Sequence, residues 1–151
     1  MTQENFSIAH TRVIGATRKR VWQAFTDPEH ISEWWGPNGF TTETETMDVR
    51  PGGAWRSVMR GPDGETYPNH FTYKEVVEPE RLVYAHGDFQ VGETWYKGFT
   101  SEVMFEEEGR KTKVTLRAVF ASEEELEKQK MLGADEGGAQ TLARLDSYLS
   151  K

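Results

Sequence analysis

A chain of 151 residues, of which 36% are hydrophobic and 12% aromatic, has the size and composition of one folded domain rather than of a disordered protein. The absence of cysteine excludes a disulfide scaffold, thiolate catalysis and any cysteine-ligated metal site, and it suits the reducing cytoplasm, where we expect the protein. A formal net charge of −7 repels phosphate backbones and anionic lipids, and no apolar run approaches the roughly 18 residues that span a bilayer. We therefore expect neither nucleic acid nor membrane as a partner.

The first part of the chain predicts one strand followed by two short helices. Residues 6–13 alternate between apolar and polar side chains, as a half-buried strand does. Residues 17–26 change to the helical period behind a threonine N-cap, and residues 28–35 form a second short helix that starts with proline. This second helix contains Trp34 and Trp35, whose directions differ by about 100°. We expect one of them to pack on the sheet and the other, with Trp35 as our choice, to face a pocket.

The middle of the chain, from residue 40 to about 120, predicts strands and tight turns with no helix between them. Proline and glycine mark the turns, as in RPGG at 50–53 and GPDG at 61–64. About six strands joined in this way form an antiparallel meander rather than βαβ units. The aromatic connection at 87–98, GDFQVGETWYKG, fits three interpretations: a mobile flap, a patch for a partner, or a hairpin tip folded onto its own sheet.

The C-terminal part predicts a long amphipathic helix. A capping box at 122–125 begins it, and Gly133 favours a break or kink in the middle. Beyond that point Leu142, Leu145 and Leu149 form an apolar stripe. The predicted fold is α+β, with an antiparallel sheet of about seven strands that curves round this helix. A twisted sheet of that breadth leaves space that one helix cannot fill, so a cavity is expected between them.

Several motifs resemble a known family. TRKRVWQAFTDPEHISEWWGP at 17–37, RPGGAWRSVMRGPDG at 50–64 and VVEPERLVY at 76–84 look like the activator of heat-shock protein 90 ATPase homologue-like family, in the right order and at compatible spacing. GGAQTLARLDSYL at 137–149 resembles the family's terminal helix, so the resemblance covers essentially the whole chain. It implies a single START-like (SRPBCC) domain over residues 1–151 with the helix-grip fold, in which an antiparallel sheet wraps round a long C-terminal helix.

The resemblance is specific for the fold and weak for the activity. The superfamily includes lipid carriers, hormone receptors, polyketide cyclases, self-sacrificing resistance proteins and co-chaperone domains. Eukaryotic co-chaperones of this name also carry a separate N-terminal domain, for which we find no room in this chain. We therefore expect a domain that binds a small hydrophobic or aromatic molecule. A chaperone-associated module acting through its surface and a cyclase-like or hydrolase-like enzyme stay open as alternatives.

Strand positions that share one face by alternation predict the lining of the cavity. Large aromatic residues, adaptable methionines and a few polar groups suit a mostly apolar site. With Trp35 and two leucines of the last helix, the predicted ligand-binding residues are Trp35, Met47, Trp55, Ser57, Met59, Phe71, Tyr73, Tyr84, His86, Val103, Phe105, Leu142 and Leu145.

The sequence offers little for catalysis. The histidines lack metal-ligand spacing, and nucleophile-elbow, P-loop and dinucleotide-binding motifs are missing, so we expect no metal and no cofactor. Glu75 and His86 are the candidates for an ionisable catalytic group, Glu75 because a carboxylate buried beside Phe71 and Tyr73 could act as a general base. We expect binding rather than catalysis, in a monomer or a homodimer.

Overall fold

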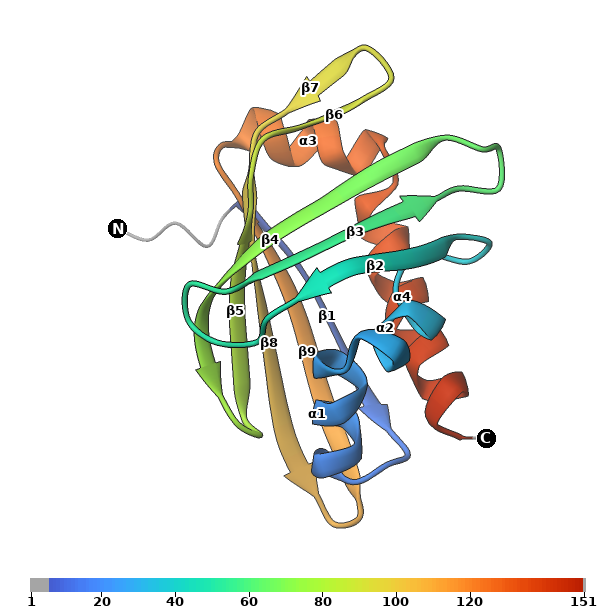
Figure 1. Cartoon of the computed structure of the whole chain (residues 1–151), viewed down its shortest axis with the longest axis vertical. Coiled ribbons are helices and arrows are strands. Elements are labelled where there is room, and N and C mark those ends of the chain that lie inside the picture. Colours follow the sequence, from blue (N-terminus) through green and yellow to red (C-terminus); the bar gives the residue numbers. More distant parts are fainter. Residues whose placement is uncertain (1–5, 151) are drawn as a thin grey trace.

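The computed structural model describes residues 6–150, which fold as one curved sheet with helices on its inner face (Figure 1). Seven strands form a single antiparallel sheet in the order β1-β9-β8-β5-β4-β3-β2, and β6 and β7 form a separate hairpin. The α+β fold expected from the sequence is confirmed. The elements are β1 (Ser7–Ile14), α1 (Arg18–Thr26), α2 (Pro28–Trp34), β2 (Thr41–Met47), β3 (Ala54–Arg60), β4 (Thr66–Val77), β5 (Arg81–His86), β6 (Phe89–Val91), β7 (Thr94–Tyr96), β8 (Phe99–Glu108), β9 (Lys111–Phe120), α3 (Glu123–Met131) and α4 (Ala134–Leu149).

The first two helices begin where the sequence places their caps. The Thr17 side chain accepts a hydrogen bond from the backbone N–H of Arg20 at the start of α1. Asp27 caps α2 in the same way by accepting from Glu29, and Pro28 occupies the first helical position. The two short helices are thereby separated by a single extended residue, so the chain turns sharply between them.

The helices divide the inner face of the sheet between them. Figure 1 shows α1 and α2 at one end of the sheet, with the β6–β7 hairpin and α3 at the opposite end. Between these ends α4 packs against the same face through Leu142 and Leu145, which join the main hydrophobic core. The concave face is therefore closed at one end by α1 and α2 and bounded at the other by α3 and the hairpin.

The C-terminal helix is broken near residue 133, as expected. Gly133 adopts a φ of 102° between α3 and α4, a conformation that favours glycine. The glycine pair that follows has a different role, because it lets two other segments approach α4 closely. A Cβ on Gly137 would lie 3.1 Å from the ring of Pro37, and one on Gly138 would lie 2.7 Å from the imidazole of His10.

Residues 87–98 form a hairpin with its own two-stranded sheet, β6–β7, rather than an extension of the main sheet. Phe89 and Tyr96 face each other across the hairpin and stack at 5.1 Å between ring centroids. Trp95 lies on the opposite side and is 60% exposed. Within residues 6–150, none of the helices is both long and apolar enough to cross a membrane.

Candidate functional site

A cavity of about 220 Å³ lies between the concave face of the sheet and the helices α3 and α4. It occupies the end of that face that α1 and α2 leave uncovered. Strands β1, β3, β4, β5, β8 and β9 contribute to it, together with β6, the segment after α2, and α3–α4. Its lining residues are Ile8, His10, Trp35, Gly36, Pro37, Phe40, Met59, Tyr67, Pro68, Asn69, Phe71, His86, Phe89, Phe99, Ser101, Leu116, Ala118, Phe120, Gln129, Leu132, Gly133, Ala134, Gly137, Gly138 and Thr141.

A row of rings crosses five adjacent strands, and its rings on β4, β5, β8 and β9 form the floor of the cavity. The register pairs Trp55 with Phe71, Phe71 with His86, His86 with Phe99, and Phe99 with Phe120. Neighbouring rings in the row lie 4.8 to 5.7 Å apart between centroids, alternating between stacked and edge contacts at its start. Because residues directly opposite in an antiparallel pair point to the same side of the sheet, the row presents one continuous ring surface.

The predicted ligand-binding residues fall into two groups along the strands. Trp35, Met59, Phe71 and His86 line the cavity. The remaining predicted positions lie outside it, in or against the core that α1, α2 and α4 cover, because these helices fill that part of the concave face. They are Met47, Trp55, Ser57, Tyr73, Tyr84, Val103, Phe105, Leu142 and Leu145.

The two neighbouring tryptophans have different surroundings. Trp34 is fully buried, packs edge-on against Phe25 at 4.8 Å, and donates from Nε1 to the carbonyl of Ala24 at 3.1 Å. Trp35 follows the last residue of α2, contacts Trp55 at 5.1 Å, and lines the cavity. The structure therefore places Trp34 in the core and Trp35 in the cavity wall.

Glu75 lies away from the cavity, contrary to the alternation that placed it beside Phe71 and Tyr73. The pairing of β4 with β5 shifts between Tyr73 and Glu75, and this bulge turns the carboxylate outward. There Glu75 accepts a hydrogen bond from the guanidinium of Arg81 at 2.9 Å, and its side chain is 52% exposed. A general base for a ligand in the cavity is therefore not found at this position.

His86 is buried on the cavity floor with both ring nitrogens near backbone groups. Nδ1 lies 2.7 Å from the carbonyl of Gly87, and Nε2 lies 3.1 Å from the N–H of His70. The neutral tautomer with its proton on Nδ1 satisfies both contacts, donating to Gly87 and accepting from His70. The carbonyl of Pro68, 2.9 Å from Nε2, accepts a hydrogen bond only when Nε2 carries a proton, and then Nε2 no longer accepts from His70.

Burial dominates the ionisation of the titratable groups near the cavity. It lowers the pKa of His86 below its ordinary value, against the opposing effect of the carbonyls of Gly87 and Pro68. Burial also raises the pKa of Tyr73 and of Tyr84, so both phenols stay protonated. The deep part of the site is therefore uncharged near neutral pH.

Some cavity residues were missed by the sequence reasoning, although alternation reaches most of them. Phe99 and Ser101 continue the period of Val103 and Phe105, and Asn69 continues that of Phe71 in β4. Gln129 carries no such signal, because it belongs to the highly polar helix α3 and becomes buried only where that helix meets the cavity. Phe89 also carries no such signal, because it lies in the hairpin, outside the alternation of the main sheet.

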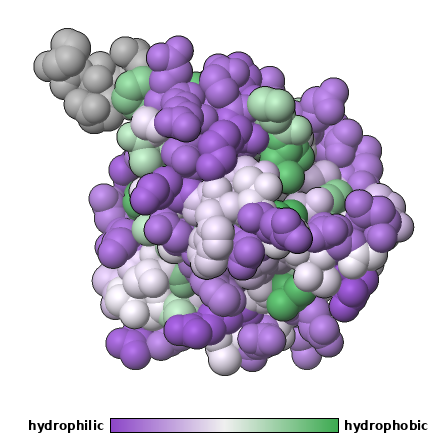
Figure 2. Space-filling model, turned by 90° about the horizontal axis from the view of Figure 1, so that it is seen from above, coloured by the Kyte–Doolittle hydropathy of each residue, from purple (hydrophilic) through white to green (hydrophobic). Residues whose placement is uncertain are grey.

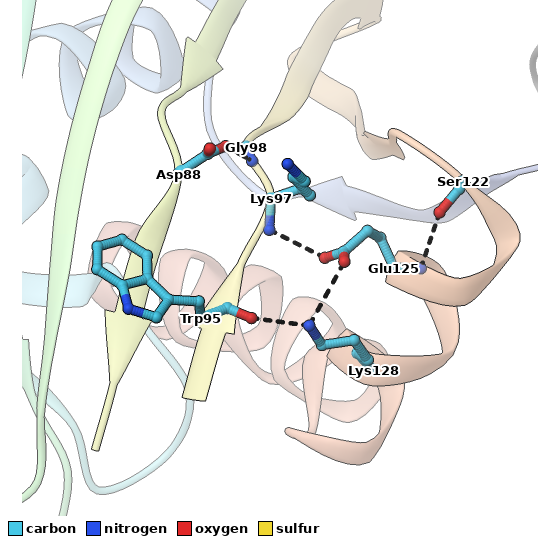
Figure 3. Close-up of polar contacts among 7 residues, drawn as sticks. All are labelled: Asp88, Trp95, Lys97, Gly98, Ser122, Glu125 and Lys128. Carbon is cyan, nitrogen blue, oxygen red and sulfur yellow. Dashed lines mark hydrogen bonds and ion pairs between the residues drawn. The ribbon is translucent and has the colours of Figure 1, made fainter. Parts of the chain in front are cut away.

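A polar latch holds the hairpin to α3 at the border of the cavity (Figure 3). Glu125, buried in α3, accepts from the backbone N–H of Lys97 at 2.9 Å and pairs with Lys128 at 3.4 Å. Lys128 in turn donates to the carbonyl of Trp95 at 2.7 Å. We refer to Glu125 and Lys128 with these contacts as the hairpin latch. Because Phe89 of the hairpin and Gln129 of α3 both line the cavity, the latch fixes two of its walls.

The outer surface at this end contrasts with the cavity. Figure 2 looks down on the molecule from above and shows a mostly hydrophilic face, with hydrophobic residues in small separate groups. The lining of the cavity is instead dominated by aromatic and aliphatic side chains.

The curved antiparallel sheet, the helix packed on its concave face and the cavity between them define a START-like protein with the helix-grip fold. The family model described as "Activator of Hsp90 ATPase homolog 1-like protein" matches residues 15–150, so the chain belongs to this family. The family expected from the sequence motifs is thus confirmed. Its members often bind hydrophobic ligands, and it is of a ligand-binding or chaperone-associated kind.

Solved structures of bacterial proteins are similar over nearly the whole chain. The protein Ms6760 from Mycobacterium smegmatis is 28% identical with a TM-score of 0.86, over 98% of this chain and 93% of that one. A protein from Arthrobacter aurescens is 25% identical with a TM-score of 0.86, over 99% and 89% of the two chains. The AHSA1 protein from Silicibacter pomeroyi is 18% identical and shares the fold, with a TM-score of 0.78 over 95% and 97%. Among curated proteins, none matches the chain.

Proposed function

We propose that this protein binds a small, mostly apolar molecule in the cavity between the sheet and helices α3 and α4. The observation that carries the proposal is the row of rings on the cavity floor, where Phe71, His86, Phe99 and Phe120 line the cavity. Ring surface that packs against no other side chain forgoes dispersion contacts that a ligand would restore. Membership in a family whose members often bind hydrophobic ligands supports the same function.

The cavity volume sets the size of the ligand. An apolar cavity of about 150 Å³ accommodates benzene. At about 220 Å³ the cavity has room for one ring with a short substituent, and not for a sterol or a long acyl chain. We therefore expect single-ring compounds to bind without rearrangement of the helices.

Native mass spectrometry of freshly purified protein, followed by titration with single-ring compounds under NMR observation, tests this proposal. We expect either a co-purified mass or binding in the micromolar range, with chemical-shift changes concentrated at residues that line the cavity. Absence of any co-purified mass together with absence of binding by the whole series would contradict it. Shift changes confined to the outer surface would contradict it as well.

A chaperone-associated role is the second candidate, because the family's description names the Hsp90 ATPase. Two large apolar side chains favour a surface role, since Trp95 is 60% and Met131 is 88% exposed at the end where the hairpin meets α3. Stimulation of the ATPase of the host's heat-shock protein 90 would support it, provided that the double substitution Trp95→Ser, Met131→Ser removes the effect. No stimulation at excess protein would reject this role without affecting the proposal for the cavity.

A further inference from the structure

Two side-chain amide nitrogens in the cavity wall have no hydrogen-bond partner. Asn69 projects from β4 and Gln129 from α3, and each residue is only 5% exposed. Nδ2 of Asn69 and Nε2 of Gln129 are both buried without a partner. A buried amide N–H that makes no hydrogen bond is unfavourable and rare in folded proteins, so two at one cavity point to an acceptor within it.

The neighbouring polar groups of the cavity do not accept from these two nitrogens. The ring nitrogens of His86 contact the backbone of Gly87 and His70, and the hydroxyl of Thr141 donates to the carbonyl of Gly137 at 2.7 Å. The amides come from opposite walls, one on the sheet and one on a helix. An oxygen atom of a molecule inside the cavity is a suitable acceptor for their N–H groups.

The charge of the cavity wall restricts the ligand further. Among the described residues that line the cavity there is no aspartate, glutamate, lysine or arginine. Of the histidines there, His86 is held by backbone groups, and Nε2 of His10 already faces the carboxylate of Asp135 at 3.1 Å. Apart from this pair the described lining offers no charged partner, so an ionic ligand is disfavoured relative to a neutral one of the same size.

We infer that the cavity selects neutral single-ring compounds that carry a carbonyl or hydroxyl oxygen, with Asn69 and Gln129 as the groups that recognise this oxygen. The inference rests on the proposed function, since it names the class of ligand for the same cavity. It separates the roles of the lining residues: the ring surface of β4, β5, β8 and β9 binds the body of the ligand, and the two amides orient it. This combination of apolar surface with a few directed polar groups is how small-molecule sites achieve specificity.

Three ligands of the same size test the inference on the unaltered protein: acetophenone, ethylbenzene and benzoate. A purely apolar cavity would favour ethylbenzene, because a carbonyl loses its hydration on entering such a cavity. We expect the opposite order, with acetophenone binding at least about tenfold more tightly than ethylbenzene. Benzoate is expected to bind more weakly than acetophenone. Isothermal titration calorimetry measures all three dissociation constants.

Substitutions identify the groups responsible. Asn69→Leu and Gln129→Met replace each amide by an apolar side chain of similar size. We expect either substitution to weaken acetophenone binding about tenfold while ethylbenzene binds as well as before, which also shows that the cavity is intact. Gln23→Met, on the exposed side of α1, is the matched control and should change neither constant.

The outcomes separate this inference from the proposal on which it rests. Equal or tighter binding of ethylbenzene would overturn the inference and still support an apolar binding site. Tighter binding of benzoate would overturn the assignment of a neutral ligand. If acetophenone binds tightest but both substitutions leave it unchanged, the assignment of Asn69 and Gln129 is wrong. Failure of all three ligands to bind would count against the proposed function itself.

Discussion

Trp34 stabilises the sharp turn between α1 and α2 in a way that depends on Pro28. In a continuous helix the carbonyl of Ala24 would accept from the residue four positions on, which is Pro28 and has no N–H. The indole of Trp34 supplies the missing donor at 3.1 Å. The proline that begins α2 and the tryptophan that ends it therefore act together, and Trp35 remains available for the cavity wall.

Trp34→Phe should lower the free energy of unfolding by about 1–3 kcal/mol, because it leaves the buried carbonyl of Ala24 without its donor. The same change at Trp35 removes no hydrogen bond that holds the fold, and we expect it to alter ligand binding more than stability. Urea unfolding of the two variants measures the difference. Equal losses of stability at the two positions would show that the indole hydrogen bond contributes little.

His86 should make the stability of the protein depend on pH. Burial lowers its pKa in the folded state, so the unfolded chain binds the proton more readily. The neutral ring makes its full contribution to the free energy of unfolding above about pH 6.5, the ordinary histidine pKa. This contribution is lost as the pH falls through about 6.5 towards the folded-state pKa.

NMR titration of the His86 imidazole, together with unfolding free energies measured between pH 5 and pH 8, checks this prediction. We expect the ring to titrate below its ordinary value, and the decline of stability on acidification to be smaller in His86→Gln. The nearby titratable group is His70, whose charge also disfavours protonation of His86. A pKa at or above the ordinary value would contradict the prediction.

At the scale of elements, the hairpin latch joins two segments that otherwise share few contacts. Glu125 and Lys128 lie one turn apart on α3, so both reach the end of β7 and the residue after it. The carboxylate of Glu125 satisfies the backbone N–H of Lys97, and the ammonium of Lys128 also lies 5.1 Å from the ring centre of Tyr96. Opening of the hairpin requires these contacts to break together.

Glu125→Ala should loosen the hairpin without unfolding the sheet. It removes the acceptor of Lys97 and the partner of Lys128, at an expected cost of about 1–3 kcal/mol. Hydrogen exchange is expected to accelerate at residues 88–98, while strands β4 and β5 stay protected. Glu127→Ala, an exposed position on the same helix, is the control. Equal protection of the hairpin in the two variants would show that the latch does not hold it.

The elements themselves could be predicted from the sequence because their periods are regular. Alternation in β8 and β9, the caps of α1 and α2, and the glycine at position 133 all gave the right kind of element. Glu75 could not be placed in the same way. A bulge adds one residue to a strand and moves all later side chains to the other face, and the composition of β4 does not mark where this happens.

The sequence indicates which face of the sheet lines the cavity, but not where along that face the cavity lies. Alternation correctly places Tyr84 and His86 on the inner side of β5, yet the first lies in the core and the second in the cavity. The difference depends on which end of the strands the helices cover, and this is a tertiary property. Gln129 could not be found at all, because its burial depends on the packing of α3 against the cavity.

At the scale of the whole molecule, the concave face has one solid half and one hollow half. Trp22 and Phe25 of α1 pack edge-on against Phe105 of β8 and fill the first half. The second half is bounded by α3, which is short and polar, and by the hairpin. The packed core and the proposed ligand site thus lie at opposite ends of the same sheet, so we expect a substitution in the hollow half to change binding at little cost to folding.

Ala118→Leu tests this separation. Ala118 of β9 lies on the cavity floor opposite Ser101, so a leucine there would fill part of the cavity. We expect the stability of the variant to be unchanged or higher, and the ligand-induced increase in Tm to be lost. In the parent protein this increase corresponds to a stabilisation of about 2.7 kcal/mol at a ligand concentration of 100 times Kd.

Ala85→Leu, the same substitution on the outer face of β5, two strands away, is the control and should leave the ligand-induced shift in place. Retention of the full shift in Ala118→Leu would show that the ligand binds elsewhere. A large loss of stability in Ala118→Leu, with the control stable, would show that the space around Ala118 is smaller than the cavity volume indicates.

The row of rings also determines how a bound molecule would behave in a magnetic field. An aromatic ring shifts protons above its face upfield and protons beside its edge downfield, and Phe71 stands at 89° to Phe99. The resonances of a ligand seated on this floor are therefore expected to shift in both directions, and by more than those of a ligand on the outer surface. The arrangement of the sheet thus allows occupancy to be read from the ligand's own spectrum, without any label on the protein.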